Sequence, residues 1–146
     1  MALTINCIQW GSVQYTQMLE LRKTVLLQPI GVPFIYIVPE NEKTDFLIAA
    51  FDGEHMLGCC VLTPRTNGAI QLRQMAVNTH LQQKGVGRMI VQFAEDIARQ
   101  NGFQLLYMHA RNPVMEFYTK CGYSVDGTEF EEVGIKHHRM QKRLVV

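Results

Sequence analysis

One amphipathic helix constrains the fold of this chain more than any other segment. Its apolar residues recur at three- and four-residue steps: Val86, Met89, Ile90, Phe93, Ala94, Ile97 and Ala98. Gly102 then ends the pattern in the way that glycine commonly ends helices. Because a helix with one apolar face buries that face against another layer, we expect it to cover one side of a sheet.

Three consecutive β-rich runs before this helix predict the sheet. Residues 45–52 and 55–63 flank Asp52-Gly53-Glu54, a turn signal, and should form an antiparallel hairpin. Residues 70–77 continue it as a third strand. Further strands are expected at residues 4–10, at residues 104–110, near Ser124 and at residues 135–144.

Two more helices complete the predicted element order. Ser12 is a candidate N-cap for a helical region that ends at Pro29, and residues 29–42 are expected to form a docked loop. Asn112 and Pro113 fit the N-cap and first turn of a short helix that ends at Gly122. We therefore predict the α/β (α+β) class, with a mixed, mostly antiparallel sheet of about six to seven strands and helices on both faces.

Composition limits the functions to consider. The 146 residues are 47% apolar and 18% charged, which predicts one globular domain spanning residues 1–146. A formal net charge of +1 supplies no global field for nucleic acid or an anionic membrane. There is no apolar run near 18 residues, and the four cysteines lack C-x-x-C spacing. These observations favour a cytoplasmic protein with free thiols, no bound metal, no membrane partner and no nucleic-acid partner.

A glycine-rich segment, Gln82 to Arg88, precedes the long helix. Glycines let successive backbone N–H groups point inward, and a helix start adds partial positive charge, so this segment could hold a diphosphate. The alternative is that the glycines only permit close packing of helix on strand. A Rossmann fingerprint is disfavoured because Ile90 stands where its third glycine would be. A Walker loop is disfavoured because no Gly-Lys-Ser or Gly-Lys-Thr occurs.

The spacing Gln82-x-x-Gly85-x-Gly87 resembles the Q/R-x-x-G-x-G/A signature of the GNAT acetyltransferases. Met75-Ala76-Val77 is similar to the splayed strand of that family, and residues 117–123 resemble its F-Y-x-x-x-G-F segment. Residues 131–140 further resemble the tail of ElaA-like small bacterial members. The resemblance implies the GNAT fold, acetyl-CoA as cosubstrate and these cofactor-binding residues: Met75, Ala76, Val77, Gln82, Gln83, Lys84, Gly85, Val86, Gly87, Arg88, Asn112 and Tyr118.

The resemblance also implies catalytic roles. Tyr118 matches the family tyrosine that lies near the sulfur, so it is the candidate acid for the departing thiolate, although it could instead be a packing residue. A backbone N–H near Met75 to Val77 is the candidate oxyanion donor. Many members carry a carboxylate base on the strand that matches residues 70–77, where this chain has none. Glu132 and His137 are the candidates for the base, with surface residues as the alternative.

We therefore expect an N-acetyltransferase that acts on a primary amine of a small-molecule or peptide acceptor. The alternative is a non-catalytic acyl-CoA-binding or regulatory module on the same fold. The acceptor is not identified by the sequence, and both a monomer and a homodimer are compatible with it.

Overall fold

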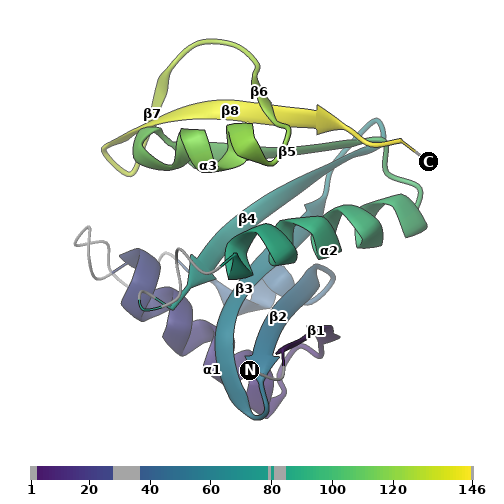
Figure 1. Cartoon of the computed structure of the whole chain (residues 1–146), viewed down its shortest axis with the longest axis vertical. Helices are drawn as coiled ribbons and strands as arrows, with labels where there is room; N and C mark the ends of the chain where they lie inside the picture. The colour runs from purple at the N-terminus through teal and green to yellow at the C-terminus, as the bar shows by residue number, and fades with distance from the viewer. Residues whose placement is uncertain (1–2, 28–36, 79, 81–84, 146) are drawn as a thin grey trace.

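The computed structural model describes residues 3–27, 37–78, 80 and 85–145, and these build one mixed sheet with helices on both faces (Figure 1). The strand order is β1-β2-β3-β4-β5-β8-β6, and β7 pairs with β8. Strand β1 (Leu3–Ile8), which the sequence predicts at residues 4–10, lies at one edge of the sheet. The described residues therefore carry eight strands, one or two more than the predicted six to seven.

The predicted meander is confirmed. Strands β2 (Phe46–Asp52), β3 (His55–Pro64) and β4 (Ala69–Val77) follow one another as antiparallel neighbours. The connection from β2 to β3 requires Gly53, whose φ of +60° lies in the left-handed region. Local turn chemistry and the alternating pattern are sufficient to specify this half of the sheet.

Strand β4 carries a bulge near its end. Val61 lies opposite Arg73 and Cys59 lies opposite Ala76, so two residues of β4, Gln74 and Met75, face a single residue of β3. Gln74 has a φ of 55°, which is uncommon for a residue with a side chain. The bulge redirects the last residues of β4.

Strand β5 (Leu105–Arg111) pairs in parallel with β4 over only three residue pairs, from Ala69↔Leu105 to Gln71↔Tyr107. Beyond Gln71 the two strands diverge, and Figure 1 shows them together at one end and apart at the other. This divergence is the splayed strand that the family resemblance implied.

The last strands are β6 (Ser124–Val125), β7 (Phe130–Glu132) and β8 (Ile135–Arg143). β8 pairs antiparallel with β5 along the whole of β5. β7 was not predicted, because three residues that include Glu131 and Glu132 show no apolar alternation. It pairs with β8 by register, from Phe130↔His137 to Glu132↔Ile135.

The helices begin and end near the predicted residues. α1 (Val13–Arg22) has Ser12 as its N-cap, whose Oγ accepts a hydrogen bond from the Tyr15 N–H at 3.2 Å. It continues as a π-helical turn over Lys23–Leu27. The predicted loop at residues 29–42 lies partly outside the described residues, and its described part includes a 3₁₀ turn, Pro39–Glu42.

The amphipathic helix is α2 (Val86–Gln100), and the short helix is α3 (Met115–Lys120). A 3₁₀ turn, Asn112–Val114, precedes α3, and the Asn112 side chain makes no capping hydrogen bond, so the predicted N-cap is wrong. Within the described ranges, none of the helices combines the length and apolar character needed to cross a membrane.

Two cores lie on opposite faces of the sheet. On one face α2 contributes Ile90 and Val91 to a cluster that includes Cys60. On the other face α1 contributes Tyr15 and Met18 to a cluster that includes Cys59. Consecutive cysteines of β3 thus point to opposite layers, as strand geometry requires. Met89 departs from the predicted apolar face of α2, because 41% of it is exposed.

A buried ion pair ties the α1 layer to the bulge. Arg22 donates from Nη1 and Nη2 to the two Glu42 carboxylate oxygens at 2.8 and 2.7 Å. The Tyr15 hydroxyl donates to Glu42 Oε1 at 2.6 Å, and Arg22 Nε donates to Gln74 Oε1 at 3.3 Å. Burial alone would raise the pKa of Glu42, but the Arg22 hydrogen bonds and charge outweigh it and lower that pKa.

Replacing Arg22 by Leu should leave the Glu42 charge buried and unpaired. We expect the free energy of unfolding to fall by about 3–5 kcal/mol, measured by urea denaturation. The Arg22→Leu/Glu42→Leu double variant should recover part of this loss, because it removes both charges. As a control, Lys120→Leu breaks the exposed Lys120–Glu116 pair and should cost about 0.5 kcal/mol or less. Equal losses in Arg22→Leu and Lys120→Leu would contradict this role for the pair.

Candidate functional site

The divergence of β4 from β5 exposes one edge of the β4 backbone. The Asn78 N–H donates to the Leu57 carbonyl oxygen of β3 at 2.9 Å. That hydrogen bond lies on the edge of β4 that faces β3, and the opposite edge faces β5. The pairing with β5 ends at Gln71, so no strand of the described chain lies beside Met75 on that edge.

Helix α2 begins next to this opening (Figure 1). Its N-cap is Gly85, with φ 81° and ψ 2°, and this residue has no side chain to cap the helix start. A Cβ built at Gly85 would meet no heavy atom within 4 Å. Gln82, Gln83 and Lys84 of the predicted loop lie outside the described residues.

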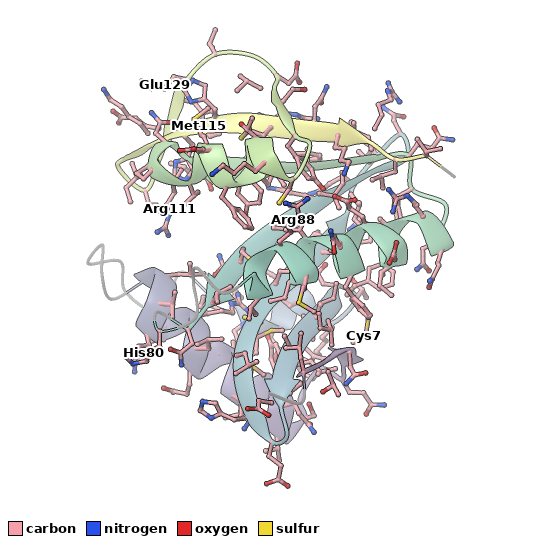
Figure 2. The ribbon with its side chains drawn as sticks, in the orientation of Figure 1. Cys7, His80, Arg88, Arg111, Met115 and Glu129 are labelled. Atoms are coloured by element: carbon pink, nitrogen blue, oxygen red, sulfur yellow. The ribbon has the colours of Figure 1, made fainter. Side chains whose placement is uncertain are left out.

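The other residues of the predicted loop differ in their surroundings. Val86 is buried in the core. Gly87 is also buried, and a Cβ there would lie 3.2 Å from the Phe117 ring, so this glycine permits the close approach of α3 to α2. Arg88 is exposed and lies on the side of α2 that faces α3 (Figure 2). The packing role of glycine that the sequence left open therefore applies to Gly87, whereas Gly85 adopts the left-handed conformation.

Tyr118 lies on α3 and is 6% exposed. Its ring makes edge contacts with Phe117 and Tyr123, at centroid distances of 5.0 and 6.1 Å. Within the described residues no protein group accepts a hydrogen bond from its hydroxyl. Burial raises the pKa of the Tyr118 phenol above its usual range, so the hydroxyl keeps its proton at neutral pH.

A cavity of about 610 Å³ lies near the same opening. Its lining residues are all polar: Asn41, Thr63, Arg65, Gln71, Arg73, His109 and Glu132. Gln71 of β4 is two residues before Arg73, and its partner Tyr107 of β5 is two residues before His109. Arg73 and His109 therefore each lie two residues beyond the last β4–β5 pair, where the two strands begin to diverge.

The cavity and Tyr118 lie on opposite faces of the sheet. Tyr118 packs in the α2 core with Ala110 of β5. His109 precedes Ala110, so strand alternation points its side chain to the α1 face. The opening between β4 and β5 therefore has the buried phenol on one side and the polar cavity on the other.

Two cavity residues form a hydrogen-bonded pair that the sequence did not reveal. His109 Nδ1 lies 2.8 Å from Glu132 Oε2, and Phe130 makes an edge contact with the His109 ring at 5.0 Å between centroids. His109 stands in no sequence pattern that assigns it a role, and its partner is on β7, the unpredicted strand. The pairing of β5 and β7 with the same strand, β8, brings the two side chains together.

The structure separates the two candidate bases. Glu132 lines the cavity, whereas His137 does not. His137 is 5% exposed, its Nδ1 lies 2.7 Å from the Ile135 carbonyl oxygen, and its ring stacks on Phe130 at 5.8 Å. A buried ring with these contacts is poorly placed to meet an acceptor in the cavity, so the hypothesis of a His137 base loses its geometric support.

Asn112, another predicted cofactor contact, has both ends of its side-chain amide engaged. Its Nδ2 donates to Glu129 Oε2 at 2.8 Å, and its Oδ1 lies 2.9 Å from His138 Nδ1. These contacts link the 3₁₀ turn before α3 to β8 and to the segment before β7. A cofactor contact by this side chain would have to replace one of them.

The described residues contain no group of three or more His, Cys, Asp or Glu side chains that could hold a metal ion. All four cysteines are free thiols, and Cys59 and Cys60 are buried. Burial raises the pKa of the Cys59 thiol to about 12, which makes it a poor nucleophile at neutral pH.

Residues 15–123 match the model of the acetyltransferase (GNAT) family, and the chain belongs to this family. Among curated proteins, it is 29% identical over 79 residues to an uncharacterised N-acetyltransferase of Chlorobaculum tepidum, covering 54% of this chain and 49% of that protein. It is 27% identical over 84 residues to a protein of Xenopus tropicalis assigned as N-acetyltransferase 14, covering 55% and 41%. The chain spans about half the length of these relatives or less.

Solved structures share the whole fold. A protein of Lactobacillus plantarum assigned as an N-acetyltransferase has a TM-score of 0.90, with 20% identity and coverage of 99% and 100%. Escherichia coli ElaA has a TM-score of 0.83, with 16% identity and coverage of 96% and 99%. An aminoglycoside 6′-N-acetyltransferase complexed with coenzyme A has a TM-score of 0.81, with 15% identity and coverage of 98% of each chain. At these identities the likeness shows the fold, and the predicted GNAT fold is confirmed.

Proposed function

We propose that this chain, as a single domain over residues 1–146, transfers an acetyl group from acetyl-CoA to a primary amine of a small-molecule or peptide acceptor. The observation that carries the proposal is the opening between β4 and β5, with the α2 start at its edge and the polar cavity on the other face. A CoA-type cosubstrate is supported by the aminoglycoside acetyltransferase of the same fold, which is complexed with coenzyme A.

The residues at the start of α2 fit a diphosphate. Gly85 leaves open space where other residues carry a Cβ, and the first N–H groups of a helix are unpaired donors with partial positive charge. Exposed Arg88 adds a charge on the side facing α3. We assign Gln82, Gln83 and Lys84 to this site because of the family signature alone. Bound there, acetyl-CoA supplies an acyl group that is already activated as a thioester.

The β4 edge serves as the oxyanion donor in this proposal. The donor is a backbone N–H of the stretch from Met75 to Val77, and a fixed backbone donor needs no reorganisation when negative charge develops on the carbonyl oxygen. The Arg22–Gln74 hydrogen bond supports this role, because it holds the bulge residue that directly precedes Met75. Ala76 and Val77 continue the same stretch of β4.

We expect Gly85→Asp to abolish acetyl-CoA binding in calorimetry, because the new carboxylate would stand beside the diphosphate. Gly102→Asp is a matched control at the other end of α2, since both glycines have φ near +80° and no heavy atom within 4 Å of a built Cβ. An aspartate favours a helix start and disfavours a helix end, so unfolding cannot explain a loss confined to Gly85→Asp. Equal affinity in the two variants would place the diphosphate elsewhere.

Tyr118 stabilises the departing sulfur in this mechanism. The amine nitrogen forms a bond to the carbonyl carbon, and the C–S bond breaks to release CoA thiolate. Because the pKa of the buried phenol is raised, full proton transfer to a thiolate is unfavourable, and Tyr118 acts by donating a hydrogen bond. The proton-donor role that the sequence suggested uses the same hydroxyl and stays a prediction.

Tyr118→Phe keeps the ring and removes only the hydroxyl. We expect kcat to fall by about 100-fold, with little change in acetyl-CoA affinity, in a thiol-release assay. Since the Tyr118 pKa is raised, the parent enzyme should show no alkaline loss of activity from this group below a pH of about 10. Tyr123→Phe, which removes the hydroxyl that binds Glu95, should lower stability and leave kcat unchanged. A Tyr118→Phe variant with kcat within about threefold of the parent would return this residue to a packing role.

We propose that His109 is the base and that Glu132 positions it. With its Nδ1–H donated to the Glu132 carboxylate, the ring leaves Nε2 free to accept a proton from the acceptor amine. This tautomer is assigned from the 2.8 Å contact. Glu132 thus keeps its place in the site, acting through His109.

His109→Gln should lower kcat/KM by about 100-fold, because it removes the proposed proton acceptor. Glu132→Gln keeps a hydrogen-bonding group and should cost less, about tenfold. His137→Gln, outside the cavity lining, should leave kcat/KM within about threefold of the parent. If His137→Gln caused the large loss and His109→Gln did not, the base assignment would be reversed. Acetyl-CoA binding without thiol release from any amine would instead favour the non-catalytic module.

A further inference from the structure

The cavity beside His109 is lined by polar side chains throughout. Its volume of about 610 Å³ is within the range of small-molecule sites, but such sites are usually apolar in most of their lining. An apolar ligand would bury little apolar surface against these side chains, and it would displace the water that hydrogen-bonds to them. The cavity therefore suits a ligand that carries charge or several hydrogen-bonding groups.

Arg73 is weakly engaged for an arginine that is only 32% exposed. Its Nη1 donates to Thr63 Oγ1 at 3.3 Å, and the carboxylate of Asp45 is 4.0 Å from the same nitrogen. Asp45 Oδ2 is buried and has no hydrogen-bond partner in the part of the chain that the structure describes, so it does not accept a hydrogen bond from Arg73. Among the described residues, these are the contacts of the guanidinium, and they leave most of its five N–H donors to a ligand.

Arg65 is held in place by a neutral partner. Its Nε and Nη2 both donate to Gln71 Oε1, at 3.0 and 2.8 Å, which orients the guanidinium without a direct carboxylate contact among the described residues. The one carboxylate in the lining, Glu132, is already hydrogen-bonded to His109. The described lining of the cavity thus holds two guanidiniums and one carboxylate, with the buried Asp45 carboxylate 4.0 Å from Arg73.

We propose that the acceptor is a small amine that carries an anionic group, a carboxylate or a phosphate, and that Arg65 and Arg73 bind this group in the cavity. The inference rests on the proposed acetyl transfer and names its substrate class. Arginine is suited to planar, multidentate contacts with such oxygens, and burial beside two guanidiniums strengthens them. The amine then points toward His109, which flanks the opening between β4 and β5. A polycationic acceptor is disfavoured by the same charges.

Matched amines test the substrate class. β-Alanine is compared with β-alaninamide, and phosphoethanolamine with ethanolamine, in thiol-release assays with acetyl-CoA. We expect the anionic member of at least one pair to have a kcat/KM about tenfold higher or more. The pair with the larger ratio identifies carboxylate or phosphate as the group recognised. Equal or better activity with the neutral member of both pairs would overturn the proposal.

Variants test whether the arginines cause the preference. Arg65→Gln should reduce the anionic-to-neutral ratio about tenfold, mainly through KM. Arg73→Gln is made together with Asp45→Asn and compared with Asp45→Asn alone, so that no buried carboxylate loses its nearest cation. Arg143→Gln, at the far end of β8, is the matched control and should keep the full preference. A preference that survives in both arginine variants would overturn the assignment.

A binding measurement separates this inference from the proposed reaction. Calorimetry of β-alanine and phosphoethanolamine with the CoA-saturated protein requires no acetyl transfer. Arginine-dependent binding without thiol release would refute the reaction and leave the anion site in place. Acetylation of neutral amines, with no arginine-dependent binding of anionic ones, would refute the anion site and leave the reaction in place.

Discussion

The site depends on the early end of the parallel pairing between β4 and β5. Only three residue pairs join these strands, and the bulge at Gln74 and Met75 turns β4 away from its neighbour. A strand edge in the middle of a sheet would ordinarily be a place of unpaired backbone groups, which is costly when buried. Here the buried Arg22–Glu42 pair and its contact with Gln74 fix the local geometry from the α1 layer. The opening is thus a built feature, and it connects the two faces of an otherwise closed sheet.

Much of the fold could be predicted because its signals are local. The α2 face, the hairpin turn at Gly53 and the Ser12 cap each depend on residues that are close together in sequence. The elements that were missed depend on long-range contacts. β7 has three residues and exists because β8 supplies its partner, and the Asn112 side chain prefers Glu129 and His138 to its own helix start.

The candidate site divides in the same way. The glycine spacing before α2 marks the start of the helix, and the structure places the left-handed Gly85 there. His109 and Glu132 are 23 residues apart, and only their shared neighbour β8 brings them within 2.8 Å. Strand alternation directs one of two neighbouring histidines, His137, inward, but alternation cannot reveal that Phe130 stacks on its ring. Sequence patterns locate backbone features well, and they locate side-chain partners poorly.

This chain has no carboxylate at residues 70–77 of β4 to take a proton from the acceptor amine. Arg65 and Arg73 offer another way to favour the neutral, reactive form of that amine. An amine attacks only in its neutral form, and a carboxylate on the same acceptor normally stabilises the ammonium form. In the proposed complex, Arg65 and Arg73 neutralise that anion, and their positive charge disfavours a second cation nearby. Both effects lower the pKa of the bound amine, as does its removal from water. Because the amine then loses its proton more readily, a weaker base is sufficient. A partly exposed histidine held by Glu132 can serve in this chain, where other members place a carboxylate on the strand itself.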